Sequence, residues 1–141
     1  MLEPWERTLI EGRRVAHLGT VGASGAPHLV AVCFALLGER IVISTDEKPK
    51  RLGRLQRLRN IERDPRVTLL FDLYDDDDWT RLAWVRMEGT AAIHARGDSV
   101  EGAIKALRAR YRQYGSMAIE SLPLIEVQPL RVVSWRWTPE S

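Results

Sequence analysis

The sequence is poor in features on which many small proteins depend. Cys33 is its one cysteine, which excludes a disulfide framework and a cysteine zinc site. The longest uninterrupted apolar run, residues 29–37, is only about half of the ~18 residues that cross a bilayer. The first fourteen residues carry too much charge for a signal peptide. We therefore expect a cytoplasmic protein that does not enter a membrane.

Motifs for metal binding and nucleophilic catalysis are also missing. The histidines, at positions 17, 28 and 94, show no H-x-x-H spacing. The aspartate run 75–78 lacks the spaced ligands and glycine of a calcium loop. No G-x-S-x-G, G-x-x-x-x-G-K-[ST] or strand-linked G-x-G-x-x-G occurs, and Cys33 has no basic neighbour. The sequence predicts no metal site, and no catalytic residue can be assigned from it.

What is present is the composition of one globular domain with segregated charge. The chain has 141 residues, 45% hydrophobic and 28% charged, so we treat residues 1–141 as a single domain. The formal charge is +2, yet residues 48–66 hold eight Lys and Arg against Glu62 and Asp64. Residues 72–78 hold five aspartates. Two opposed charged patches are therefore expected.

Hydrophobic periodicity in the first half indicates mostly β structure. Trp5, Leu9 and Ile10 predict a short helix over 3–13. Runs rich in β-branched and apolar residues predict strands at 15–21, 27–37 and 41–45, the first two joined by a glycine-containing turn. Helix formers predict a helix over 50–62, ended by the proline at position 65.

The second half predicts the remaining elements. Strands are expected at 67–73 and 82–93, where alternation puts Val85 and Met87 on one face. A helix is expected from Val100 to Tyr114, with Asp98 and Ser99 at its start. Strands at 124–127 and 131–137 close the fold. The fold class is mainly β: a small barrel of six to seven mostly antiparallel strands, with a short N-terminal helix and two longer flanking helices.

The basic segment is the best candidate for a binding site. A strand that ends in Ser44-Thr45, followed by Lys48, Lys50 and Arg51 at the mouth of a helix, brings together hydroxyl, ammonium, guanidinium and amide groups that can hold a phosphate. The alternative is a solvated basic face. Residues 48–66 contain no aromatic side chain, which favours simple anion binding over a nucleic-acid surface.

Short motifs in a fixed order resemble a known family. Leu18 to Val21, then Gly25 to His28, then a strand ending in Thr45 with Lys50-Arg51 beyond it, are similar to the pyridoxamine 5′-phosphate oxidase-like (PPOX class) FMN-binding split barrels. Asn60, the D-P-R at 64–66, the acidic loop with Trp79 and the E-G-T-A at 88–91 resemble the branch that uses the deazaflavin coenzyme F420. The resemblance extends over residues 5–137 and implies a split β-barrel.

The resemblance also implies a homodimer with two cofactors at its interface, and it assigns roles by position. Thr45, Lys50 and Arg51 match residues that hold the cofactor phosphate, and the length of the segment leaves open whether Lys48 or Lys50 makes the contact. Arg57 and Asn60 match residues near the phosphate and tail. The remaining implied cofactor-binding residues are Thr20, His28, Val30 and Val32 at the ring, Ser44 beside Thr45, and Trp79 from the partner chain.

The activity that the resemblance implies is hydride transfer between F420 and an unsaturated small molecule. The acidic tail of F420 suits the basic stripe formed by Lys50, Arg54 and Arg57 at i, i+4 and i+7. Either Tyr74 or water is expected to donate the proton that the product needs. Two alternatives stay open: an FMN-dependent oxidoreductase of the same fold, and a non-enzymatic module that binds anions or nucleic acid. The preferred interpretation includes no nucleic-acid partner.

Overall fold

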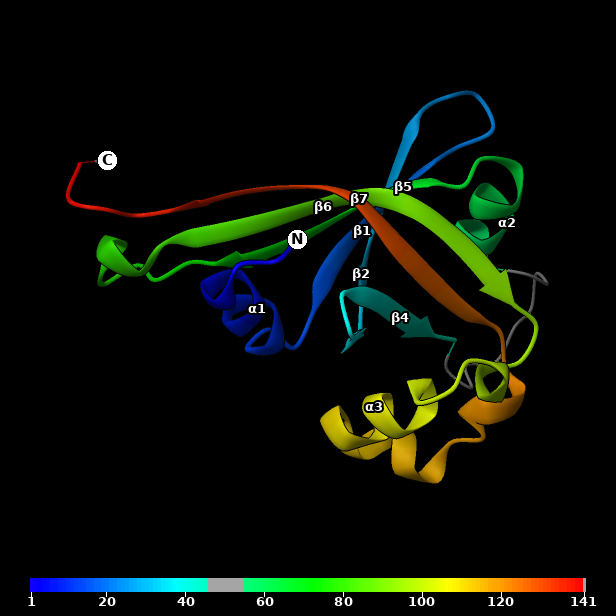
Figure 1. Cartoon of the computed structure of the whole chain (residues 1–141). Coiled ribbons are helices and arrows are strands. Elements are labelled where there is room, and N and C mark those ends of the chain that lie inside the picture. The colour runs from blue at the N-terminus through cyan, green and yellow to red at the C-terminus, as the bar shows by residue number, and fades with distance from the viewer. Residues whose placement is uncertain (46–54, 141) are drawn as a thin grey trace.

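The computed structural model describes residues 1–45 and 55–140, and in this part of the chain an antiparallel seven-stranded sheet carries three α-helices (Figure 1). The elements are α1 (Pro4–Glu11), β1 (Ala16–Val21), β2 (Pro27–Val32), β3 (Ala35–Leu37), β4 (Arg40–Ser44), α2 (Gln56–Arg63), β5 (Arg66–Leu73), β6 (Ala83–His94), α3 (Ala103–Arg110) and β7 (Leu124–Arg136). The predicted mainly β fold is confirmed.

The sheet curls because its two edge strands are neighbours in sequence. Strand order is β2-β1-β5-β6-β7-β4-β3, so β2 and β3 form opposite edges. Only Cys33 and Phe34 separate these strands, and a link of this length spans less than about 12 Å. The sheet must therefore bend until its edges almost meet, which is the geometry of a split barrel. The prediction of one strand over 27–37 is wrong, because the structure has two strands there, β2 and β3, separated by the junction of Cys33 and Phe34.

Side chains from the end of α3 hold this junction. The Phe34 N–H donates to the Tyr111 hydroxyl at 3.1 Å, and the Arg110 Nε donates to the Phe34 carbonyl at 2.9 Å. The Tyr111 hydroxyl also lies 2.9 Å from the carbonyl oxygen of Arg14, just after α1. Phe34 is fully buried, so its backbone groups need partners once they leave the β ladder. Arg110 and Tyr111, which we call the clasp, supply these hydrogen-bond partners.

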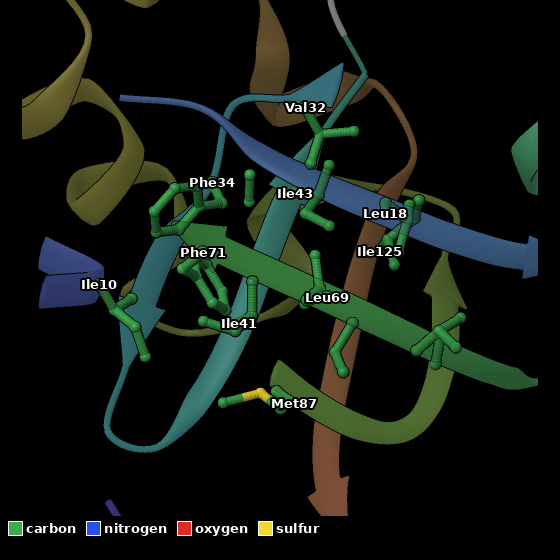
Figure 2. Packing of buried hydrophobic residues seen from close by; sticks show 14 of the residues in the cluster. Ile10, Leu18, Val32, Phe34, Ile41, Ile43, Leu69, Phe71, Met87 and Ile125 are labelled. Atoms are coloured by element: carbon green, nitrogen blue, oxygen red, sulfur yellow. The ribbon is translucent and has the colours of Figure 1, made fainter. Parts of the chain in front are cut away.

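The main hydrophobic core fills the inside of the curled sheet (Figure 2). Strands β1, β4, β5, β6 and β7 each contribute fully buried apolar side chains, and Phe34 packs edge-to-face on Phe71 with ring centroids 5.0 Å apart. Each such side chain stabilises the fold by about 1.5–3 kcal/mol through burial. In β6 the predicted alternation is confirmed, since Val85 and Met87 are buried between half-buried neighbours. A smaller core lies beneath α3.

The helix predicted from Val100 to Tyr114 is shorter than expected. The α-helix begins after Gly102, which has a φ of 84°, and ends at Arg110. Asp98 and Ser99 do not cap it: they lie in a 3₁₀ turn, η2 (Gly97–Ser99), where Asp98 pairs with Arg96. Two further 3₁₀ turns, η3 (Arg112–Ser116) and η4 (Ile119–Ser121), lead to β7. Within the described residues neither α2 nor α3 is longer than α1, and the helix predicted over 50–62 is wrong at its start, because α2 begins at Gln56 after the non-helical Leu55.

The two predicted closing strands form one continuous strand. β7 runs through Pro129, which lies opposite Gly89 at a register shift between Glu88 and Gly89. Proline cannot donate to a ladder, but a bulge tolerates it. Glycine is required at the facing position, because a Cβ on Gly89 would lie 2.2 Å from the carbonyl oxygen of Gln128. In the described ranges, no helix is long and apolar enough to span a membrane.

Tyr111→Phe is expected to lower the free energy of unfolding by about 1–3 kcal/mol, because the buried Phe34 N–H loses its acceptor. Urea denaturation followed by tryptophan fluorescence measures the change. Tyr74→Phe is the matched control, since its hydroxyl contacts only the exposed Asp76 in the described structure. Equal losses in both variants would show that the clasp does not stabilise the fold.

Candidate functional site

Asn60 links α2 to the sheet. Its side chain is fully buried, and its Nδ2 donates to the Thr20 hydroxyl on β1 at 3.0 Å. Its Oδ1 accepts from Gln56 Nε2 at 2.7 Å and from Arg63 at 3.0 Å. The structure thus brings together Thr20 and Asn60, two residues implied for cofactor binding, in a direct contact with each other. Their contact with a cofactor stays a prediction.

Thr20 lies opposite His28 in the β1–β2 register, at an edge of the sheet. His28 is half-buried, and its Nδ1 is a buried atom with no hydrogen-bond partner among the described residues. Because β2 pairs only with β1, half of its backbone N–H and C=O groups point away from the sheet. An unused ring nitrogen and an open strand edge can both accept or donate hydrogen bonds to a planar polar ligand.

Val30 and Val32 face the core. Val32 is 6% exposed and belongs to the main hydrophobic cluster, against which Val30 packs. Their side chains on this face therefore contribute stability, and a ligand beside β2 would meet chiefly their backbone. Leu29, on the opposite face, is 71% exposed.

Ser44 and Thr45 end β4 as predicted, and both are buried. The Thr45 N–H donates to the Pro123 carbonyl at 3.1 Å, and the Ser44 hydroxyl donates to the Thr45 carbonyl at 3.1 Å. Pro123 lines a groove of about 380 Å³ that also contacts Ile61 and Glu62 of α2. The end of β4 is thus hydrogen-bonded to Pro123, which lines this groove together with α2, and the described lining contains Glu62 but no basic residue.

A second groove lies over β1, the start of β2 and the start of β5. Its volume is about 480 Å³, and its lining includes Thr20, Pro27 and Arg66. The Arg66 guanidinium binds the Asp64 carboxylate at 2.6 Å, so its charge is already partly compensated. Three of the predicted phosphate ligands, Lys48, Lys50 and Arg51, lie outside the described residues. Arg57 lies on α2 and is half-buried.

Trp79 is at the far end of the sheet from α2. It belongs to η1 (Trp79–Arg81), which joins β5 to β6, and it is 62% exposed. α2 precedes the opposite end of β5, whose eight residues span about 26 Å. Trp79 therefore cannot reach the α2 site of its own chain. The acidic residues 75–78 lie with it at that far end, away from α2 (Figure 1).

The roles of Gln56 and Arg63 as partners of Asn60 were not predicted from the sequence. They contact Asn60 from positions i−4 and i+3, so all three lie on one face of α2. Arg63 also donates to the Val21 carbonyl at 3.4 Å. The spacing of polar residues around Asn60 is visible in the sequence. It indicates a hydrogen-bond network only once Asn60 is known to be buried. Among the described residues, no group of three or more His, Cys, Asp or Glu could hold a metal ion.

The curled antiparallel sheet with its flanking helices defines a split-barrel protein. The pyridoxamine 5′-phosphate oxidase family model matches residues 2–136, and the chain belongs to that family.

Three relatives illustrate the relationship. A 5a,11a-dehydrotetracycline/5a,11a-dehydrooxytetracycline reductase from Streptomyces rimosus is 28% identical over 92% of this chain and 80% of its own length. The conserved hypothetical protein Rv2991 from Mycobacterium tuberculosis superposes with a TM-score of 0.75 at 25% identity, over 96% of this chain and 85% of that one. A protein named F420 reductase superposes with a TM-score of 0.65 at 24% identity, over 94% and 98% of the two chains.

Asp64→Asn is expected to be less stable than the wild type at neutral pH and equally stable near pH 2. The Arg66 side chain, and then its N–H, lower the pKa of Asp64 from 3.8 to about 2 by hydrogen bonding. Because the folded pKa is the lower one, the stabilisation is fully present above pH ~4 and is lost as the pH falls toward 2. Urea midpoints between pH 2 and 7 measure it.

Asp77→Asn is the control for this titration, because the Asp77 side chain accepts no hydrogen bond within the described ranges. A pH dependence of the same size in both variants would contradict the assignment to the Asp64–Arg66 pair.

Proposed function

We propose that this protein is an oxidoreductase that uses coenzyme F420 to transfer a hydride to an unsaturated small molecule. The observation that carries the proposal is the relationship to the dehydrotetracycline reductase over 92% of the chain. The structural neighbour named F420 reductase has the same fold. Because one fold supports many functions, support for F420 must also come from the residues that line the grooves.

The donors and acceptors beside α2 fit a phosphate-bearing planar cofactor. Thr45 would lie at the phosphate end, where its N–H binds the Pro123 carbonyl beside the first groove, and Lys48, Lys50 and Arg51 add positive charge in sequence between β4 and α2. The unused Nδ1 of His28 and the open edge of β2 would lie at the ring end. Asn60 and Thr20 would fix the distance between these two ends by joining α2 to β1.

When bound, F420 supplies the hydride-transferring ring carbon. His28 and the open edge of β2 would hold the ring, and the chain would exclude water and orient the substrate there. Water or the Tyr74 hydroxyl provides the proton. Tyr74 is 60% exposed and adjoins the acidic loop that contains Trp79, so it would act at a partner's site.

F420 is favoured over FMN because the expected positive charge extends beyond one phosphate. Lys48, Lys50, Arg51 and Arg54 precede α2 in sequence and Arg57 lies in its first turn, and an oligoglutamate tail carries several carboxylates. FMN ends at its single phosphate and would offer fewer negative charges to these cations.

The site is proposed to be complete only in a homodimer. Trp79 is exposed at the end of the sheet that its own α2 site cannot reach. The outer face of the sheet bears a row in which Ala31, His17, Leu70, Arg86 and Val133 are successive cross-strand neighbours. Leu29 is exposed beside this row. A second copy packed on this face would cover the apolar residues and place Trp79 near the partner's cofactor. The unpaired Cys33 suits a reducing cytoplasm.

Purified protein is expected to bind F420 saturably and more tightly than FMN, because its tail carries more negative charge. Absorbance difference spectra during titration with each cofactor measure the two affinities. Lys50→Ala with Arg51→Ala should weaken F420 binding by about 2–5 kcal/mol, since both cations make charge-assisted bonds to phosphate in the proposal.

Lys105→Ala with Arg112→Ala is the matched control, because it removes the same two charges from the α3 side of the molecule. Binding of FMN alone, or of neither cofactor, would refute the proposed activity. Steep salt-dependent binding to arbitrary DNA would favour the nucleic-acid module instead.

Leu29→Glu is expected to convert the dimer to a monomer, because it places a carboxylate in the apolar part of the proposed interface. Light scattering coupled to size exclusion measures the mass. Gln113→Glu, on exposed η3, adds the same charge away from the interface. A wild-type protein that is monomeric at micromolar concentration, or a dimeric Leu29→Glu variant, would count against the interface.

A further inference from the structure

A separate cavity of about 410 Å³ lies between α1 and the far ends of β5, β6 and β7. Its lining includes Trp5 and Arg13 from α1 and the segment after it, Leu73 and Arg81 from the β5–β6 connection, and Arg136 with Trp137 from the end of β7. The β5–β6 connection and the end of β7 lie at the opposite end of the sheet from α2 (Figure 1), so the cavity that they line is at the end that carries Trp79.

Positive charge dominates this cavity. Three guanidinium groups contribute to its lining, and none of its described lining residues is acidic. Arg81 is paired with the carboxylate of Asp75, outside the lining. Arg136 lies over the Trp5 ring with its guanidinium carbon 4.8 Å from the ring centroid. A cavity of this composition favours a negatively charged occupant.

Arg13 provides an independent indication of a missing acceptor. Its Nε is a buried atom that has no hydrogen-bond partner among the described residues. Buried donors in folded proteins are nearly always satisfied, since leaving one unpaired costs about 1–3 kcal/mol. A carboxylate oxygen is the acceptor that a guanidinium group binds best, because the planar fork of donors matches it.

The size and the aromatic walls limit what else the occupant contains. Ligand cavities commonly measure about 300–1,000 Å³, so this one is suited to a molecule of one or two rings. Trp5 and Trp137 supply indole surfaces, and the backbone N–H of Trp137 donates to the Leu82 carbonyl at 3.0 Å, which fixes the end of β7 beside β6. Leu73 adds apolar surface.

We propose that this cavity binds a planar aromatic carboxylate, with its carboxylate at Arg13 and Arg136 and its ring against Trp5 and Trp137. The pairing of cations with indole rings matches both halves of such a ligand, whereas inorganic phosphate would leave the apolar walls unused. The proposal does not depend on F420 chemistry, because none of these residues belongs to the grooves beside α2.

The experiment titrates the full chain, without cofactor, with 2-naphthoate and with the neutral 2-naphthamide. Binding is followed by tryptophan fluorescence and by the indole N–H signals in ¹H–¹⁵N spectra, assigned with single Trp→Phe variants. We expect saturable binding of 2-naphthoate that shifts the signals of Trp5 and Trp137, and binding of 2-naphthamide that is weaker by roughly tenfold or more.

Arg13→Gln and Arg136→Gln should each weaken 2-naphthoate binding by roughly tenfold, because each removes a charge-assisted bond. Arg112→Gln removes the same charge from exposed η3 and should leave the affinity unchanged. Circular dichroism checks that each variant folds, and the two arginine variants test the site independently. No saturable binding, equal affinity for the neutral amide, an equal loss in Arg112→Gln, or shifts confined to the other tryptophans would each overturn the proposal.

Discussion

The two-residue junction between β2 and β3 constrains the whole structure. These strands are the opposite edges of the sheet, so a link through Cys33 and Phe34 forces the sheet to curl. The curl encloses the main core and brings Phe34 onto Phe71. The clasp of Arg110 and Tyr111 stabilises the junction and also binds backbone carbonyls just after α1. The end of α1, the β2–β3 junction and the end of α3, which are distant in sequence, therefore meet at the buried backbone of Phe34.

The same curled sheet separates two candidate binding regions by the length of β5. The groove lined by α2 and Pro123 lies at one end, and the cavity between α1 and the β5–β6 connection lies at the other. Positive groups are present at both ends, yet their surroundings differ. Near α2 the polar groups around Asn60 bind one another, and His28 Nδ1 has no partner among the described residues; at the far end the Arg13 Nε has none either, and indole rings line the cavity. In the proposed homodimer, the far end of one chain approaches the α2 site of the other.

Strands were predicted well because their signal is local. The alternation of Val85 and Met87 needs only β6 itself and appears in the structure as buried positions. The break at Phe34 was missed because it is stabilised by hydrogen bonds between residues more than seventy positions apart. The predicted start of α3 is wrong because Gly102, with a φ of 84°, precedes the helix. Continuity of β7 through Pro129 was missed for a similar reason: the bulge that accommodates the proline is formed with Gly89 of another strand.

By itself the sequence determined the class of fold, the family resemblance and the segregation of charge between residues 48–66 and 72–78, because composition, periodicity and short motifs are properties of the chain. Only the tertiary structure decided that Asn60 binds Thr20, that Val32 faces the core, and that Trp79 lies too far from α2 to serve its own site. Each of these facts is a relation between strands and helices in space. Spacing along the sequence cannot express such a relation, because the order of strands in the sheet differs from their order in the chain.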